Sequence, residues 1–180
     1  AVEKIIILRG ISGSGKSTYA KRLMEERANE GKESWMVSAD NYFMRDGEYR
    51  FDPSKLKEAH GACLKDYLRV VQHGGKVDLL IVDNTNTQLW EMAPYVAIAE
   101  AYKIPYEVID VVCPVGVALE RNVHDVPEHT LRMQEQRFEE PLPWWNSRSV
   151  SGCSASVRAR GAPGSVSGRG GAASGVDGTP

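Results

Sequence analysis

The chain has 180 residues, of which 42% are hydrophobic and 26% charged, and its formal charge is −2. This length and composition are typical of one soluble α/β domain with a substantial core. No apolar run approaches the roughly 18 residues that a membrane span needs, so we expect no membrane association and a cytoplasmic location. The acidic balance argues against sequence-blind binding along a nucleic-acid backbone. Three widely spaced cysteines argue against a disulfide framework or a zinc site.

Short apolar runs and helical patterns alternate along the first three quarters of the chain. Strands are expected at 5–8, 34–38, 79–82 and 106–112. Helices are expected at 16–28, 52–74, 90–102, 117–122 and 128–139. This alternation predicts an α/β fold with a mostly parallel sheet that helices cover on both faces. Ligands of such sheets bind at the carboxyl ends of the strands, so the residues that follow strands are the informative ones.

The composition changes sharply near the end of the chain. Residues 147–180 are rich in Gly, Ser and Ala and contain four arginines, but no aromatic residue, Leu, Ile or Lys. Such a segment buries too little apolar surface to offset the entropy of ordering it. We therefore interpret 1–146 as the folded domain and 147–180 as a disordered tail.

A phosphate-binding loop is predicted between the first strand and the first helix. The run from Gly10 to Thr18 matches G-x-x-x-x-G-K-[ST] and lies in the strand–loop–helix context that the motif requires. Backbone N–H groups of such a loop point at phosphate oxygens, and the helix N-terminus favours negative charge. Lys16 is expected to reach the β- and γ-phosphates of ATP, and Ser17 to ligate Mg²⁺. The residues predicted to bind nucleotide are Gly10, Ser12, Gly13, Ser14, Gly15, Lys16, Ser17 and Thr18.

Carboxylates follow two of the other expected strands. Asp83 comes directly after the apolar run 79–82, a position from which a carboxylate can hold Mg²⁺. Asp40 follows the second expected strand, and a carboxylate there can orient an acceptor hydroxyl and accept its proton. Capping of a turn is an equally good reading of Asp40 from position alone.

Arginines late in the chain are candidates for a clamp on the transferring phosphate. Phosphoryl transfer spreads negative charge over oxygens that a guanidinium can bind in a bidentate manner. Arg121 is the first choice, in a helical lid, and Arg132 is a second candidate for nucleotide binding. His60 is interpreted as a core histidine, and its role and that of Asn84 stay open.

The chain resembles the polynucleotide 5′-hydroxyl kinase group of P-loop kinases, in particular the Nedd-four-binding protein two type, with AAA-type and zeta-toxin-like P-loop relatives. The resemblance covers about residues 4–140. Besides the phosphate loop, it depends on the stretches Asp40-Asn41-Tyr42-Phe43, Tyr49-Arg50-Phe51-Asp52, Asp83-Asn84-Thr85-Asn86, Trp90-Glu91-Met92 and Arg121-Asn122-Val123-His124.

The resemblance implies ATP-dependent phosphorylation of a 5′-hydroxyl end of DNA or RNA. From the sequence we infer no obligate protein partner. The resemblance also implies a three-layer P-loop sandwich with strand order 2-3-1-4-5 and a helical lid, in which Asp40 activates the hydroxyl and Arg121 clamps the phosphate. Ala39-Asp40-Asn41 stands where relatives often have Thr-Asp-Asp, so Asp40 would act alone. Two alternatives stay open: a kinase of a small hydroxyl metabolite or antibiotic, and an ATP-switched binding module without phosphotransfer.

Overall fold

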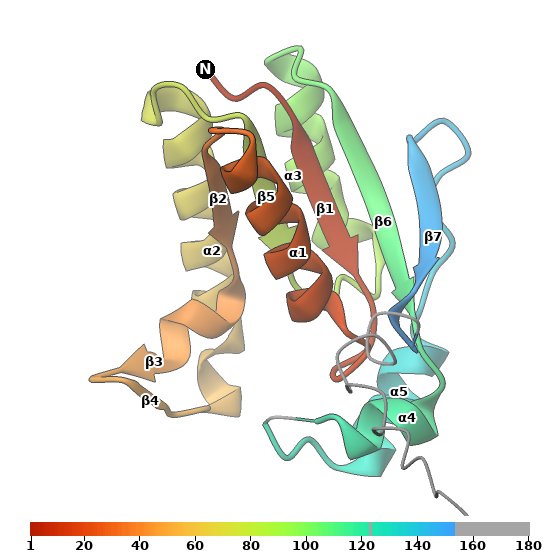
Figure 1. Cartoon of the computed structure of the whole chain (residues 1–180). Coiled ribbons are helices and arrows are strands. Elements are labelled where there is room, and N and C mark those ends of the chain that lie inside the picture. Colours follow the sequence, from red (N-terminus) through yellow and green to blue (C-terminus); the bar gives the residue numbers. More distant parts are fainter. Residues whose placement is uncertain (123, 154–180) are drawn as a thin grey trace, which may run out of the picture.

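A five-stranded sheet forms the centre of the molecule in the computed structural model, which describes residues 1–122 and 124–153 (Figure 1). All neighbouring strands are parallel, and their order is β2-β5-β1-β6-β7. Leaving out the small β3–β4 hairpin, this is the order 2-3-1-4-5, which confirms the expected topology. The strands are β1 (Ile5–Arg9), β2 (Ser34–Val37), β5 (Leu79–Asp83), β6 (Tyr106–Val112) and β7 (Ser147–Ser151).

Helices cover both faces of this sheet and confirm the three-layer arrangement (Figure 1). Helix α1 (Lys16–Asn29) covers one face, while α2 (Leu56–His73) and α3 (Leu89–Ala101) cover the other. The lid consists of α4 (Val115–Glu120) and α5 (Glu128–Gln136), which lie beyond the carboxyl end of the sheet. The remaining elements are the 3-10 turns η1 (Ala39–Phe43) and η2 (Pro53–Lys55) and the hairpin strands β3 (Met44–Arg45) and β4 (Glu48–Tyr49).

The two central strands explain why the sheet forms where it does. Every residue of β1 and β5 is buried, as expected of parallel strands with helices on both faces. Successive side chains point to opposite faces. Ile5 and Ile7 therefore pack towards α2 and α3, whereas Ile6 and Leu8 pack towards α1.

Strand β7 corrects the expected domain boundary at residue 146. It pairs in parallel with β6, from Val108 opposite Ser147 to Val112 opposite Ser151. Composition concealed this strand because it holds one apolar residue, Val150, and lies at the edge of the sheet, where backbone pairing and not side-chain burial defines it. The expected tail from 154 to 180 lies outside the described residues.

The lid packs on the start of the phosphate loop through its own small core. Ile11 of the loop, Ala118 of α4 and Leu131 of α5 are buried together. This core fixes the lid next to the loop. In the part of the chain that the structure describes, no helix is long and apolar enough to cross a lipid bilayer.

Candidate active site

The loop between β1 and α1 has a backbone that requires glycine. Gly13 and Gly15 have φ angles of 78° and 104°, in the region that other residues rarely adopt. A Cβ atom on Gly13 would lie 2.2 Å from the carbonyl oxygen of Ala118, so the loop also packs too tightly for a side chain. Helix α1 begins without a side-chain cap, which leaves the N–H groups of its first turn available to an anion.

Lys16 lies inside this loop and is 9% exposed. Its Nζ donates hydrogen bonds to the carbonyl oxygens of Gly10 (2.8 Å) and Ile11 (2.9 Å). Burial lowers the pKa of Lys16, and the charge of Asp83 opposes that shift. Two neutral carbonyl groups thus hold the ammonium group at the phosphate loop. A charged phosphate is a stronger hydrogen-bond acceptor than a carbonyl and can replace them.

Asp83 and Ser17 bring two oxygen ligands together at the end of β5. The Ser17 hydroxyl donates to Oδ2 of Asp83 over 3.0 Å. Burial raises the pKa of Asp83, while Lys16 nearby lowers it. Hydroxyl and carboxylate oxygens are the ligands that Mg²⁺ takes beside a nucleotide phosphate. The two residues therefore fit the predicted magnesium site.

Asp40 faces the loop from the far side of the sheet end. It lies in η1, and Asn84 fixes that turn by accepting the backbone N–H of Ala39 at 2.8 Å. The Tyr49 hydroxyl donates to Oδ1 of Asp40 over 3.1 Å. Ser38, and not Asp40, is the N-cap of this turn, because its Oγ accepts the backbone N–H of Asp40 at 3.2 Å. The interpretation of Asp40 as the cap of this turn is therefore wrong, and its carboxylate faces the Tyr49 hydroxyl instead.

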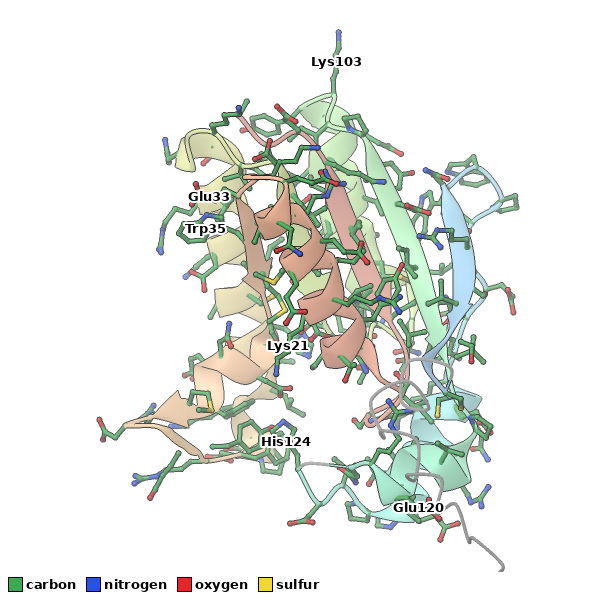
Figure 2. All side chains as sticks on the ribbon, viewed as in Figure 1. Lys21, Glu33, Trp35, Lys103, Glu120 and His124 are labelled. Carbon is green, nitrogen blue, oxygen red and sulfur yellow. The ribbon has the colours of Figure 1, made fainter. Side chains whose placement is uncertain are left out.

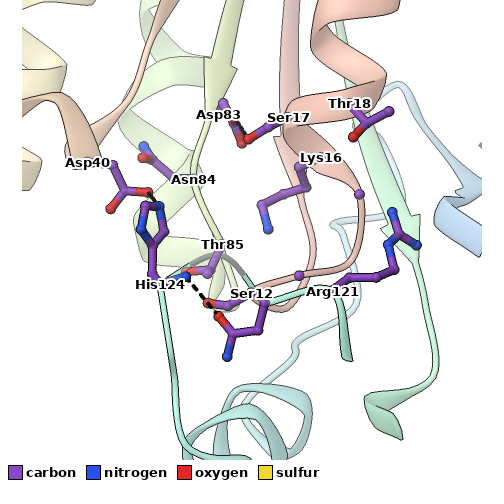
Figure 3. Close-up of a pocket in the computed structure, with 13 residues that line it drawn as sticks. Ser12, Lys16, Ser17, Thr18, Asp40, Asp83, Asn84, Thr85, Arg121 and His124 are labelled. Carbon is purple, nitrogen blue, oxygen red and sulfur yellow. Dashed lines mark hydrogen bonds and ion pairs between the residues drawn. The ribbon is translucent and has the colours of Figure 1, made fainter. Parts of the chain in front are cut away.

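Most of the predicted site residues line one pocket of about 180 Å³ (Figure 3). Gly10 and Ser14 do not line it: Gly10 supplies a carbonyl to Lys16, and Ser14 is fully buried behind the loop. The predicted residues that do line the pocket are Ser12, Gly13, Gly15, Lys16, Ser17, Thr18, Asp40, Asp83 and Arg121.

The two candidate arginines have different positions. Arg121 lines the pocket, but its guanidinium donates to the carbonyl oxygen of Gly152 over 3.1 Å, on the side of the loop away from Asp40 (Figure 3). The structure does not bring Arg132 to the pocket. Arg132 pairs instead with Glu128, one turn earlier on the exposed face of α5, at 2.7 Å.

Four residues without a predicted role also line this pocket, namely Asn84, Thr85, Asn122 and His124, and Gln134 contacts the phosphate loop beside it. Asn84 positions the Asp40 turn, as described above, and His124 lines the pocket. Gln134 of α5 binds the phosphate loop twice: its Oε1 accepts the Ser12 N–H at 2.9 Å, and its Nε2 donates to the Ser12 hydroxyl at 3.2 Å. Asn84 and His124 belong to stretches that carry the family resemblance, whereas no sequence signal pointed to Gln134.

A second, larger cavity of about 490 Å³ adjoins the first. Asp40, Asn84 and His124 line both. Aromatic rings form one wall, contributed by Phe43, Tyr49 and Phe51, and α5 forms the opposite wall. His60 lines this cavity and is only partly buried, so its interpretation as a core histidine is wrong.

Comparison with known proteins identifies the family. The profile of the AAA domain family AAA_33 matches residues 5–141, most of the chain. The chain belongs to this family. It is 37% identical over 142 residues to human NEDD4-binding protein 2. The aligned region covers 74% of this chain but only 8% of that protein. The AAA_33 domain here thus corresponds to a small part of that much longer relative.

Solved structures share the P-loop kinase fold of this AAA_33 domain. The APS kinase CysC of Mycobacterium tuberculosis, in complex with AMPPNP and APS, aligns with a TM-score of 0.60 at 15% identity, over 87% of this chain and 95% of that one. Chaetomium thermophilum Kti12, in complex with ADP-AlF3, aligns with a TM-score of 0.54 at 24% identity, over 82% and 87%. At these identities the likeness establishes the fold alone, and neither the nucleotide nor the acceptor.

Proposed function

We propose that this AAA_33 domain transfers the γ-phosphate of ATP to a 5′-hydroxyl end of a polynucleotide. The observation that carries the proposal is the position of Asp40, which lines both the phosphate pocket and the larger cavity beside it. A group at this boundary is next to both reactants. The sequence resemblance to the polynucleotide 5′-hydroxyl kinase group supports the same reaction class.

Each residue of the pocket has a defined role in this proposal. The loop N–H groups and Lys16 hold the triphosphate, and Ser17 and Asp83 would hold Mg²⁺, which supplies charge neutralisation on the phosphates. Asp40 accepts the proton of the acceptor hydroxyl as its oxygen forms a bond to the γ-phosphorus, while the bond from that phosphorus to the β,γ-bridging oxygen of ATP breaks. ADP leaves, and Asp40 later returns the proton to solvent.

Arg121 is the proposed clamp on the transferring phosphate. Its guanidinium lies close to the loop. A Cβ atom placed on Gly15 would be only 2.7 Å from Nη2 of Arg121. To reach the phosphate, the side chain has to exchange its bond to the Gly152 carbonyl for one to the ligand. A charged phosphate is the stronger acceptor, so binding favours that exchange.

A basic hollow adjoins the larger cavity of about 490 Å³, which is the acceptor cavity of this proposal, and it supports a polynucleotide acceptor. It has a volume of about 250 Å³, and three cationic side chains line it: Arg45, Arg50 and Lys55. Phe43 and Phe51 line both this hollow and the acceptor cavity, with their ring centroids 5.1 Å apart. A strand whose first nucleoside lies in the cavity would therefore pass aromatic rings and then cations, the order that suits bases and phosphates.

A small hydroxyl metabolite is the second candidate acceptor. The cavity of about 490 Å³ lies in the size range of small-molecule sites. The APS kinase that shares the fold is bound to a small acceptor, APS. Acceptors of this class would fill the cavity and make no use of the basic hollow.

One assay separates the two candidates. The protein is incubated with γ-labelled ATP, Mg²⁺ and either a 5′-hydroxyl oligonucleotide, its 5′-phosphorylated counterpart or a panel of small alcohols. We expect label on the 5′-hydroxyl oligonucleotide alone, and a loss on the order of 10²-fold in Asp40→Asn, the scale of a general base. Label on small alcohols only would reject the polynucleotide acceptor.

Charge variants test the basic hollow in the same assay. Arg45→Ala combined with Lys55→Ala should raise the KM for the oligonucleotide and reduce the salt dependence of log KM by about 0.7 for each phosphate that the protein no longer neutralises. Lys65→Ala is the matched control, because Lys65 is exposed on α2 and lies outside the hollow. Equal effects of the double variant and the control would count against a strand in the hollow.

A further inference from the structure

One face of helix α5 forms a wall of the acceptor cavity. Four residues of the helix and its C-terminal end line this cavity: Thr130, Met133, Gln134 and Arg137. Their spacing of three and four residues places them on one side of the helix, which we call the acceptor face of α5. Leu131, fully buried in the small core of the lid, lies on another side of the same helix. The rotation of α5 about its own axis therefore decides which groups an acceptor meets.

Gln134 lies in the middle of the acceptor face and pairs with Ser12 of the phosphate loop. Its Oε1 accepts the Ser12 N–H at 2.9 Å, and its Nε2 donates to the Ser12 hydroxyl at 3.2 Å. A backbone N–H can only donate, so the amide oxygen must face it, and the amide nitrogen must then face the hydroxyl. Both ends of the side-chain amide are used, which fixes its orientation relative to the loop.

This pairing lies on the acceptor side of the phosphate loop. Ser12 lines both cavities, whereas Gln134 lines the acceptor cavity and not the phosphate pocket. Lys16 and Ser17, which belong to the phosphate pocket, make their hydrogen bonds to other partners. A nucleotide can therefore bind in the pocket while Gln134 stays on Ser12.

The lid has a second attachment to the loop, which is apolar. Ile11, Ala118 and Leu131 pack together in the small core of the lid. Apolar contacts have no preferred direction, so they hold α5 near the loop but constrain its rotation only weakly. Hydrogen bonds require aligned donors and acceptors. Within residues 1–122 and 124–153, the hydrogen bonds between α5 and the phosphate loop are the two of Gln134, and these fix the rotation.

We propose that Gln134 is a positioning residue, which holds the acceptor face of α5 at the angle that aligns the acceptor hydroxyl with the γ-phosphate. The proposal rests on the proposed phosphotransfer and adds the group that aligns its two reactants. Asp40 and the aromatic wall border the cavity from the hairpin side, and α5 faces them. Figure 2 shows His124 where the lid segment approaches this hairpin side. Without the pairing, α5 turns about its core, and an acceptor binds with its oxygen misplaced.

Phosphotransfer and the hydrolysis of ATP by water together separate positioning from damage to the nucleotide site. Gln134→Met removes both hydrogen bonds and keeps a long, unbranched side chain that favours a helix. At saturating ATP, kcat for the acceptor should fall about 10–100-fold, because a misplacement of about 1 Å can cost on the order of 10²-fold. Hydrolysis without an acceptor should change less than about twofold, since water needs no wall to align it, and the Kd for ATP should stay unchanged.

Gln136→Met is the matched control, because Gln136 is exposed on the same helix and lines neither cavity. Equal kcat of the two variants overturns the positioning role. A parallel loss of phosphotransfer and hydrolysis in Gln134→Met overturns it as well, since the damage would then lie in the nucleotide site. Tighter ATP binding by Gln134→Met would show that Gln134 competes with phosphate for the Ser12 N–H, which also contradicts the proposal.

Two readouts test the pairing itself. Ser12→Ala removes the hydroxyl that Gln134 binds, so it should lower kcat in the parent and have no further effect in Gln134→Met; additive losses overturn the pairing. By NMR, the Ser12 amide proton should exchange with solvent faster in Gln134→Met than in Gln136→Met. Equal exchange overturns the pairing even in an active enzyme.

Failure of the proposed function appears in the parent, whereas failure of this inference appears only between variants. Label on small alcohols alone would reject the polynucleotide acceptor, while a fall in kcat of Gln134→Met with the alcohol would still support the role of Gln134. Full transfer to oligonucleotides by Gln134→Met would reject the positioning role and leave the polynucleotide acceptor standing.

Discussion

Replacing Gly13 by alanine should damage the phosphate loop more than its unusual backbone angle alone would explain. Alanine at a φ of 78° costs about 1–2 kcal/mol, the penalty of a left-handed conformation. The new Cβ would also lie 2.2 Å from the carbonyl oxygen of Ala118, where 3.4 Å is an ordinary contact. Overpacking of this kind adds about 1–3 kcal/mol. The expected total is about 2–5 kcal/mol.

Gly31 provides the matched control for this calculation. Its φ is 72°, close to that of Gly13, but a Cβ there would have no atom within 4 Å. Gly31→Ala therefore carries the backbone penalty without the steric one. Urea unfolding of both variants and titration with ATP–Mg²⁺ measure the difference. We expect Gly13→Ala to lose stability or at least tenfold in ATP affinity relative to Gly31→Ala, since tenfold corresponds to about 1.4 kcal/mol. Equal behaviour of the two variants would refute the close approach of α4 to the loop.

Two other predictions concern buried polar groups. Arg9 is fully buried and donates to three backbone carbonyls, so Arg9→Met should lower the free energy of unfolding by about 3–5 kcal/mol. Arg69→Met, at an exposed position on α2, is the control and should change the free energy of unfolding by less than about 0.5 kcal/mol. Similar urea midpoints of the two variants would contradict this prediction. Burial raises the pKa of Cys113 to about 11, so the fraction of reactive thiolate should rise about tenfold per pH unit from pH 7 to 10. The rate of alkylation of Cys113 by iodoacetamide, followed by mass spectrometry, should rise in the same proportion. A rate that reaches a plateau by pH 9 would show an ordinary thiol and contradict the prediction.

The phosphate loop and the central sheet were predictable because their signals are local. The loop needs glycines at fixed positions, and buried parallel strands need continuous apolar runs, so both patterns are readable in a few adjacent residues. Asp83 was found by the same logic, as the residue that ends β5. Asn84 beside it belongs to the same signal, although its contact with the Asp40 turn is visible only in the fold.

The edge strand and the acceptor side were not predictable in the same way. Strand β7 is defined by pairing with β6, which residue type does not reveal at a sheet edge. His124 and Gln134 reach the site through the packing of the lid, and no local pattern marks either contact. For Arg132, the sequence spacing indicates a surface ion pair and not a place in the site. Glu128 and Arg132 are four residues apart on a helix, a spacing that favours the surface pair the structure contains.

Titration of the protein with ATP in the presence of Mg²⁺ is the most direct measurement of the triphosphate site on which the account depends. We expect the parent to bind and Lys16→Ala to bind about 10–100-fold more weakly, the scale of one hydrogen bond to a charged group. Lys21→Ala, at an exposed position of α1, should bind like the parent. Absence of binding by the parent, or equal affinity of Lys16→Ala and Lys21→Ala, would contradict the account.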